Sequence, residues 1–289
     1  MALVLNEDQV MLKDSAAGFL AERATVAHLR ELRDSHSERG FSDAVWREMV
    51  EMGWAGIAIP EAFGGLGYGY TGLGLVLEQA GRNLSASPLQ SSVLVAATLV
   101  AELGSGGQKE QWLPAIASGE KLVTLALQEG RHHAPEQTAA RAEQEGDEYV
   151  ISGAKTLVLD AHVADAFLVI ARAAGEPPAQ AGLSAFLVDA GAPGLSVERR
   201  SMVDSRNAGT VTLDGVRVPA TALLGAAGEA WAGLERTLDI ANIGLASELL
   251  GLSEEAFERT VAYLKERKQF GRVIGSFQGL QHRAAELFA

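Results

Sequence analysis

Apolar residues recur three or four positions apart through most of residues 1–119, which is the spacing of a helix with one buried face. Asn6 and Ser42 each stand just before such a stretch, and both residue types cap helix N-termini by accepting a backbone hydrogen bond. The same spacing returns over residues 231–264. The pattern therefore predicts a helical N-terminal domain over residues 1–119 and a second helical part over residues 225–289.

Between these helical parts the pattern changes to alternation and to short apolar runs bounded by Gly, Pro and Asp. Residues 148–153 alternate directly after a Gly146-Asp147 turn signal, as a strand of a hairpin does. Further stretches with the β-branched and aromatic composition of strands cover residues 122–127, 163–173, 183–189, 195–201 and 210–213. We predict an antiparallel β-domain over residues 120–224. The order helical, β, helical predicts an α+β fold with segregated domains.

Composition narrows the class of protein. A chain of 289 residues, 47% of them hydrophobic, is long enough for two or three domains. A net charge of −13 without a basic stripe argues against nonspecific nucleic-acid binding. The absence of cysteine excludes disulfides and thiolate metal sites and suits a reducing compartment. With no signal peptide and no apolar run of about 18 residues, we predict a cytoplasmic protein without a membrane span.

The run from Arg267 to Gln278 concentrates residues that suit cofactor binding. Arg267 offers a rigid fork of donors for phosphate oxygens, and Gly271 permits a turn. Phe270 and Phe277 offer apolar faces to a flat ring. A plainer interpretation is that Arg267 is a cation favoured by the C-terminal end of a helix dipole.

This run resembles the RxxFGxxIxxFQ segment of acyl-CoA dehydrogenases, which reaches across a subunit interface to a neighbour's FAD. Four further stretches resemble that family in order and spacing: Pro60–Gly67, Leu113–Glu120, Gly153–Lys155 and Leu213–Pro219. The resemblance implies FAD-dependent α,β-desaturation of an acyl-CoA in an oligomer, with an electron-transferring flavoprotein as acceptor. It implies that the FAD-contacting residues of this run are Arg267, Gln269, Phe270, Phe277 and Gln278.

The resemblance also implies flavin contacts within the same subunit, and these depart from the family pattern. Gln128 begins the stretch where the family has Thr-Glu-Pro, and Ala134 lies where a later Gly-Ser-Asp is expected. Leu157 replaces a tryptophan beside the flavin, and Leu159 replaces a threonine that bonds near N5. Gln128, Leu157 and Leu159 are therefore the expected own-subunit cofactor residues, and only Gln128 among them carries a polar side chain.

No catalytic base is expected within these residues. In most of the family the base lies further along the C-terminal bundle, of which this chain carries the first two helices; in a minority it falls at the position of Ala241. Asp239 matches a substrate-contacting aspartate, and Asn242 stands where an arginine is usual. Glu235 and Glu248 are interpreted as solvated or interface carboxylates.

Three hypotheses remain open at this stage. The chain is a subunit of a tetrameric FAD enzyme acting on an acyl-CoA, or it is a lesioned partner that completes the FAD site of an unlike subunit. Such pairs occur among bacterial members of the family, including sterol side-chain enzymes. The third hypothesis is a non-catalytic protein that retains the fold. The adjacent His132 and His133 are interpreted as loop residues rather than metal ligands.

Overall fold

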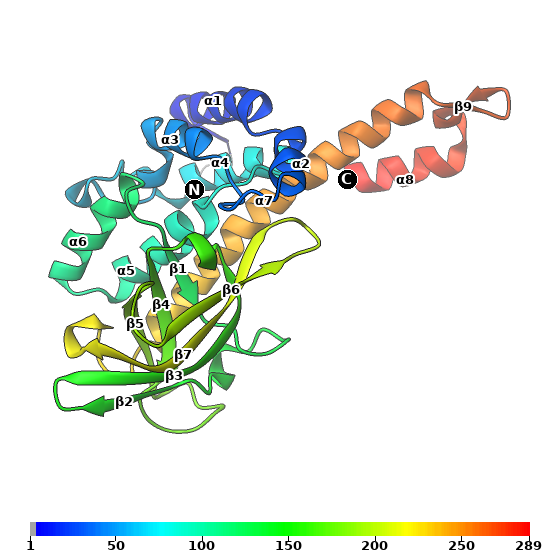
Figure 1. Cartoon of the computed structure of the whole chain (residues 1–289). Coiled ribbons are helices and arrows are strands. Elements are labelled where there is room, and N and C mark those ends of the chain that lie inside the picture. The colour runs from blue at the N-terminus through cyan, green and yellow to red at the C-terminus, as the bar shows by residue number, and fades with distance from the viewer. Residues whose placement is uncertain (1–3) are drawn as a thin grey trace.

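The computed structural model describes residues 4–289, so the first three residues of the predicted N-terminal domain lie outside it. Figure 1 shows a group of helices, a curved β-sheet beside it, and one long helix that leaves the body. The helices of the first group are α1 (Glu7–Arg23), α2 (Val26–Asp34), α3 (Asp43–Glu51), α4 (Gly69–Asn83), the π-helix η3 (Leu89–Ala96), α5 (Ala97–Leu103) and α6 (Gly106–Ala117). The predicted α+β class is confirmed.

The predicted helix starts are correct. Asn6 accepts a hydrogen bond from Gln9 N at 2.8 Å, and the Gln9 side chain accepts one from Asn6 N at 3.0 Å. Ser42 accepts from Val45 N at 3.3 Å. These side chains satisfy N–H groups that the first turn of a helix leaves free.

The sheet is mostly antiparallel, as predicted, but it also contains a parallel pairing that the sequence pattern did not indicate. Strand β1 pairs in parallel with β4, with Val123 opposite Ala166, and one residue pair of β2 and β4 is also parallel. The long connection through β2 and β3 permits this, since parallel neighbours need a crossover rather than a tight turn. The strands are β1 (Val123–Ala126), β2 (Arg141–Glu145), β3 (Glu148–Leu159), β4 (Ala166–Arg172), β5 (Leu183–Asp189), β6 (Leu195–Ser201), β7 (Asn207–Pro219) and β8 (Leu223–Leu224).

Helix α7 (Trp231–Glu266) begins against the body and ends far from it. The part of α7 up to Gly251 packs on α4 with the backbones almost touching. A Cβ atom added at Gly251 would lie 1.8 Å from the Glu78 carbonyl oxygen, and one at Gly81 would lie 1.9 Å from that of Glu248. Glycine at both positions is what allows the two helices to approach this closely.

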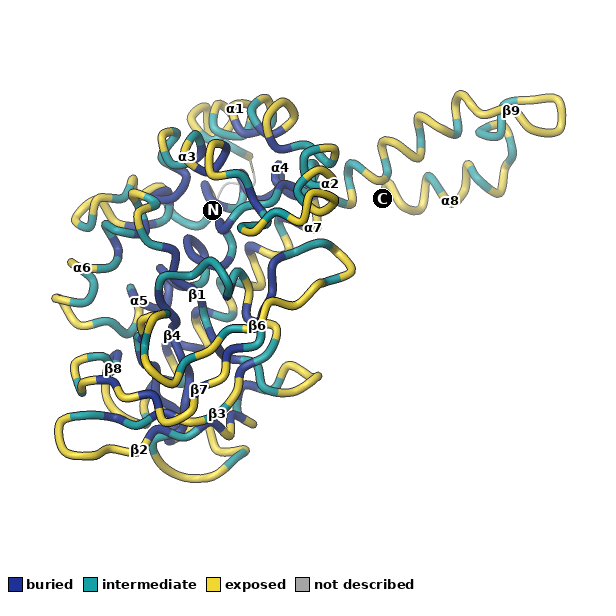
Figure 2. The backbone as a smooth tube through the Cα atoms, in the orientation of Figure 1, coloured by how far each residue is buried: buried dark blue, intermediate teal, exposed yellow. Residues whose placement is uncertain are grey.

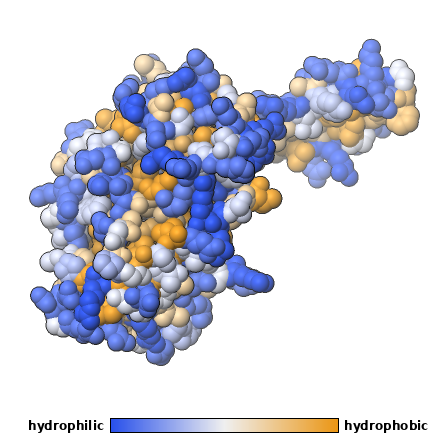
Figure 3. Space-filling model, in the orientation of Figure 1, coloured by the Kyte–Doolittle hydropathy of each residue, from blue (hydrophilic) through white to orange (hydrophobic). Residues whose placement is uncertain are grey.

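The second half of α7, the hairpin of β9 (Lys268–Gln269) and β10 (Arg272–Val273), and helix α8 (Gln278–Phe288) form a projecting arm. The arm is exposed along almost its whole length in Figure 2. Figure 3 shows hydrophobic surface on the arm. Among its large apolar side chains, Phe270 is 90%, Leu287 74% and Phe288 81% exposed. No helix within residues 4–289 is long and apolar enough to cross a membrane.

Candidate functional site

The end of β3 turns two leucines outward. The pairing of β3 with β7 shifts between Lys155 and Val158, and Leu157 within this irregularity has a φ of 52°. Such bulges re-aim side chains at the end of a strand. Leu157 is 44% and Leu159 41% exposed, which is unusual for large apolar residues at the end of a buried sheet.

Gln128 lies beside this bulge but its side chain is directed into its own loop. Its carbonyl oxygen accepts a hydrogen bond from Thr156 N at 2.7 Å, which holds the loop of residues 128–140 against β3. The Gln128 amide donates to Gly130 O at 2.8 Å and also to His132 O. The structure thus brings Gln128 and Leu157 onto neighbouring segments, next to a cavity of about 360 Å³ formed by the loop.

Two buried cations anchor the same loop. Lys155 Nζ lies 2.6 Å from Glu129 Oε1 and donates to Leu127 O at 3.2 Å, while Glu129 accepts from the backbone N–H groups of Ala139 and Ala140. Burial lowers the pKa of Lys155 to about 8, although Glu129 opposes that shift. Arg172 is also buried, and its guanidinium donates to four carbonyl oxygens: those of Glu136, Thr138, Ala179 and Ala181.

A cavity of about 480 Å³ lies between α4, η3, the end of β3 and α7. We call it the leucine cavity, since its lining includes Leu29, Leu84, Leu159, Leu245, Leu249 and Leu252. Asp160 lies on its wall with a φ of 52°, accepting from Ser91 Oγ at 2.5 Å and from Asn207 Nδ2 at 3.0 Å. Burial raises the pKa of Asp160, and these hydrogen bonds limit the rise.

The interpretation of Glu248 as a solvated or interface carboxylate is wrong. Glu248 is 7% exposed and lines the leucine cavity, where it forms an ion pair with Arg206 and accepts a hydrogen bond from Gln90 Nε2. Both carboxylate oxygens are occupied, so the side chain is a cross-link rather than a free base. Glu235, by contrast, is exposed as expected.

The two residues of α7 that were predicted to meet substrate do not line this cavity. Asp239 and Asn242 are both exposed and lie one turn apart, while Ala241 between them is half-buried. Glu248 is seven positions beyond Ala241, which corresponds to roughly 10 Å along the helix axis. Glu248 is therefore too far along the helix to act as a base in place of the residue at position 241.

The predicted cofactor residues lie in or directly beside the hairpin at the end of the arm: Arg267, Gln269, Phe270, Phe277 and Gln278. Phe270 and Gly271 form its two-residue turn with φ values of 51° and 78°, as in a type I′ turn. The rings of Phe270 and Phe277 meet edge to face at 6.1 Å, and the Arg272 guanidinium lies 4.1 Å from the Phe277 ring centre. The projecting part of α7 separates this hairpin from β3, whose end carries Leu157 and Leu159 (Figure 1).

Sequence profiles of the three acyl-CoA dehydrogenase domains match this chain in order. The N-terminal domain matches residues 6–120, the middle domain residues 127–216 and the C-terminal domain residues 228–289. The chain belongs to the acyl-CoA dehydrogenase family. The resemblance inferred from the motifs is therefore confirmed.

Individual acyl-CoA dehydrogenases extend this similarity. The chain is 34% identical to acyl-CoA dehydrogenase FadE27 of Mycobacterium tuberculosis over 91% of its own length and 66% of that protein. It superposes on the Tcur3481-Tcur3483 steroid ACAD G363A variant with a TM-score of 0.84 and 37% identity, covering 97% of this chain and 73% of the other. The ChsE4-ChsE5 complex from Mycobacterium tuberculosis gives a TM-score of 0.87 and 29% identity, with 99% and 74% covered.

The chain spans about two thirds of the length of the curated acyl-CoA dehydrogenases it matches, 65% and 66% for two of them.

Proposed function

We propose that this chain is a subunit of an FAD-dependent acyl-CoA dehydrogenase assembly and that its hairpin completes a FAD site held mainly by another subunit. The observation that carries the proposal is the state of Phe270. This residue adopts a left-handed backbone that disfavours side chains, and its ring is 90% exposed at the tip of the arm. Both features are unfavourable in an isolated chain, and contact with a partner offsets the exposure.

The residues of the chain's own flavin segments fit FAD only in part. Leu157 and Leu159 give an exposed apolar surface that suits one face of a flat ring. Neither side chain can donate or accept a hydrogen bond, and the Gln128 amide already donates to Gly130 and His132. This set supports a weak half-site, and it favours the hypothesis of a partner subunit over that of a self-sufficient enzyme.

When bound, FAD supplies the acceptor for the hydride that leaves the acyl group. The contribution that we propose for this chain is to hold and orient. Arg267 and Gln269 offer donors for phosphate and ring oxygens, Phe270 and Phe277 an aromatic surface, and Gln278 an amide. Asp239 and Asn242, exposed on one face of α7, are the proposed contacts to the acyl-CoA. The proton acceptor in this proposal comes from elsewhere in the assembly.

Hetero-oligomeric relatives support an unlike partner. Two similar structures are each named for two proteins, Tcur3481-Tcur3483 and ChsE4-ChsE5, and the first is called a steroid ACAD. We extend this to a hetero-oligomer, a tetramer by family resemblance, that acts on a sterol side-chain or fatty acyl-CoA in the cytoplasm. By the same resemblance its electron acceptor is an electron-transferring flavoprotein.

The test is to purify the protein alone and after co-expression with a second acyl-CoA dehydrogenase subunit from the same organism. We expect colourless protein alone and flavin absorbance in the joint complex, reduced when an acyl-CoA is added. A yellow protein that reduces its flavin without a partner would instead favour a self-sufficient enzyme. Failure to acquire FAD in either preparation would favour the non-catalytic hypothesis.

A further inference from the structure

A second cavity, of about 370 Å³, adjoins the leucine cavity on the side of α2. We call it the arginine cavity, because Arg33, Arg199, Arg200 and Arg206 line it. The two cavities share five lining residues: Leu29, Gly40, Met202, Ser205 and Arg206. The two cavities therefore adjoin, with Leu159 in the apolar one and the other arginines beyond Arg206.

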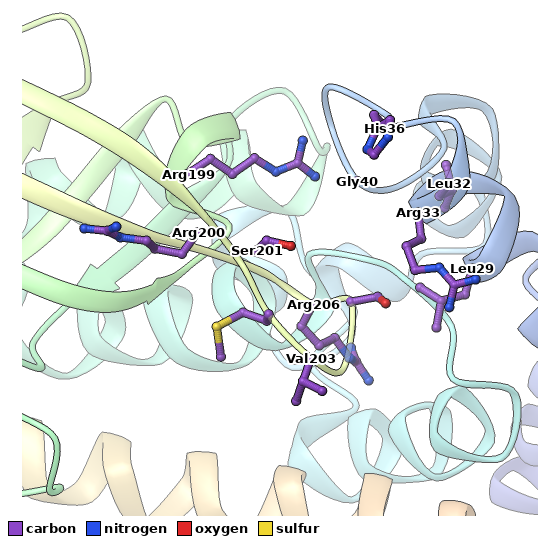
Figure 4. Close-up of a pocket in the computed structure, with 12 residues that line it drawn as sticks. Leu29, Leu32, Arg33, His36, Gly40, Arg199, Arg200, Ser201, Val203 and Arg206 are labelled. Carbon is purple, nitrogen blue, oxygen red and sulfur yellow. The ribbon is translucent and has the colours of Figure 1, made fainter.

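The charge of the arginine cavity is opposite to that of the chain. No aspartate or glutamate is among its described lining residues, although the chain carries 37 acidic residues and a net charge of −13. In Figure 4, Arg33 from α2 and Arg206 from the segment between β6 and β7 approach the space from different sides, while Arg200 extends away from it. His36 adds a further nitrogen-bearing side chain to the wall.

Most of these guanidinium groups already have a carboxylate partner. Arg206 pairs with Glu248, Arg200 with Glu198, and Arg33 with the adjacent Asp34, in a pair that is more than half exposed. Arg199 is different, because it donates only to neutral oxygens, those of Ser37, Glu38 and the Asn207 side chain. Within residues 4–289 it forms no ion pair, so its position is fixed and its charge is unmatched.

We propose that the arginine cavity binds a carboxylate group whose apolar tail occupies the leucine cavity. Arginine binds carboxylates through paired, charge-assisted hydrogen bonds, and the adjoining apolar walls select a ligand with a hydrocarbon part. The leucine cavity has a volume in the range that encloses small organic ligands. This inference rests on the proposed function. In the proposed assembly, the ligand is an acyl-CoA whose acyl chain carries a carboxylate at the end away from the thioester.

The test measures binding by calorimetry to the full-length protein in the oligomer in which it purifies. The probes are octanoate, the uncharged octanamide of equal length, and inorganic phosphate, which has charge without a tail. We expect octanoate to bind at least tenfold more tightly than either of the others, a ratio that one charge-assisted hydrogen bond accounts for. Because neither flavin nor turnover is involved, failure of the proposed function would leave this result unchanged.

Variants locate the carboxylate. Arg199→Gln and Arg33→Gln should each weaken octanoate binding about tenfold, while Arg30→Gln, an exposed charge on the same helix α2 outside the cavity, should not. Arg33→Gln guards against misfolding of Arg199→Gln, because the Arg33 side chain bonds to the neighbouring Asp34 and not to a distant segment of the described chain. The proposal would be overturned if octanamide or phosphate bound as tightly as octanoate, or if the three variants bound octanoate with equal affinity.

The same variants test the substrate class in the active assembly. The CoA thioester of octanedioate, with its free carboxylate at the far end, should be preferred over octanoyl-CoA, and Arg33→Gln should abolish that preference. If neither thioester reduces the flavin while octanoate still binds through the arginines, the proposed function fails and the binding site stands. Turnover of both thioesters at equal rates, unaffected by Arg33→Gln, would count against the site.

Discussion

Lys155 Nζ lies 2.6 Å from Glu129 Oε1, and the Lys155 side chain has no exposed surface. The pair joins β3 to the loop of residues 128–140, because Glu129 also accepts two backbone hydrogen bonds from that loop. A buried charge of this kind is tolerated only when it is paired, and loss of one partner leaves the other unsatisfied. The position of Gln128 therefore depends on an ion pair made beside it.

Glu129→Gln should destabilise the protein by about 3 kcal/mol at neutral pH, since it leaves the Lys155 ammonium buried without its counter-charge. The double variant Lys155→Met with Glu129→Gln should recover most of that loss, because an apolar side chain of similar length needs no partner. Urea unfolding of the three proteins measures both effects. A double variant that is less stable than Glu129→Gln alone would contradict this account of the pair.

The stability of the protein should depend on pH through Lys155. Its pKa is about 8 in the folded protein and 10.5 in an unfolded chain, so between these values the unfolded state holds more protons. The contribution of Lys155 to the free energy of unfolding is therefore least below pH 8 and rises as pH increases from 8 to 10.5. Subtracting the pH dependence of stability of the Lys155→Met, Glu129→Gln double variant from that of the unsubstituted protein isolates this rise. The same pH dependence in both proteins would exclude it.

Asp160 should contribute a pH dependence of the opposite sign. Burial raises its folded pKa above the ordinary 3.8, so the folded state holds the proton to higher pH and its contribution to stability falls as pH rises above that value. Asp160→Asn keeps an oxygen for Asn207 and an amide that can donate to Ser91, and it does not ionise. The stability of the variant relative to the natural protein should increase between pH 4 and pH 7, as measured by urea unfolding. A difference that stays constant with pH would count against a raised pKa.

Sequence patterns predicted the elements whose apolar residues follow a clear period or whose caps are local. Helix α1 and strands β5 and β6 are of this kind. Helix α2 was not predicted because it has no buried residue, and β2 because only Ala142 of its five residues is buried. A turn at Gly271 was predicted, but the two short strands β9 and β10 beside it were not, since Phe-Gly is not the usual sequence for two residues with positive φ.

The site was harder to predict because its contacts join residues far apart in sequence. Gln90 is 158 positions and Arg206 42 positions from Glu248, and no spacing rule relates them. Lys155 belongs to a sequence motif, but its partner Glu129 is 26 positions earlier in the chain. The flavin segments remain a prediction from the family resemblance, whereas the anchoring ion pairs and both cavities became visible only in the fold.

The close crossing of α4 and α7 predicts opposite outcomes for one substitution at two glycines. Gly251→Ala should destabilise the protein by about 2–3 kcal/mol, because the added methyl group would overlap the Glu78 carbonyl and force the helices apart. Gly18→Ala is the matched control within α1, where nothing lies within 4 Å of the new Cβ. It should stabilise by about 0.5–1 kcal/mol through helix propensity alone. Thermal unfolding measures both effects. Equal changes in melting temperature for the two variants would show that the crossing of α4 and α7 is not tightly packed.

The turn of the arm predicts that stability and cofactor binding respond differently to a change at Phe270. Phe270→Asn replaces an aromatic residue with one that tolerates the left-handed backbone, so the free energy of unfolding of the chain should change by less than about 0.5 kcal/mol. The joint complex should nevertheless bind FAD several-fold more weakly, because an aromatic contact contributes about 0.5–1.5 kcal/mol. Met11→Gln, which removes an exposed apolar side chain from α1, is the control and should leave FAD affinity unchanged. If Phe270→Asn complexes titrate with FAD as the unsubstituted complex does, the exposed ring does not serve the cofactor, and subunit packing alone would have to account for its position.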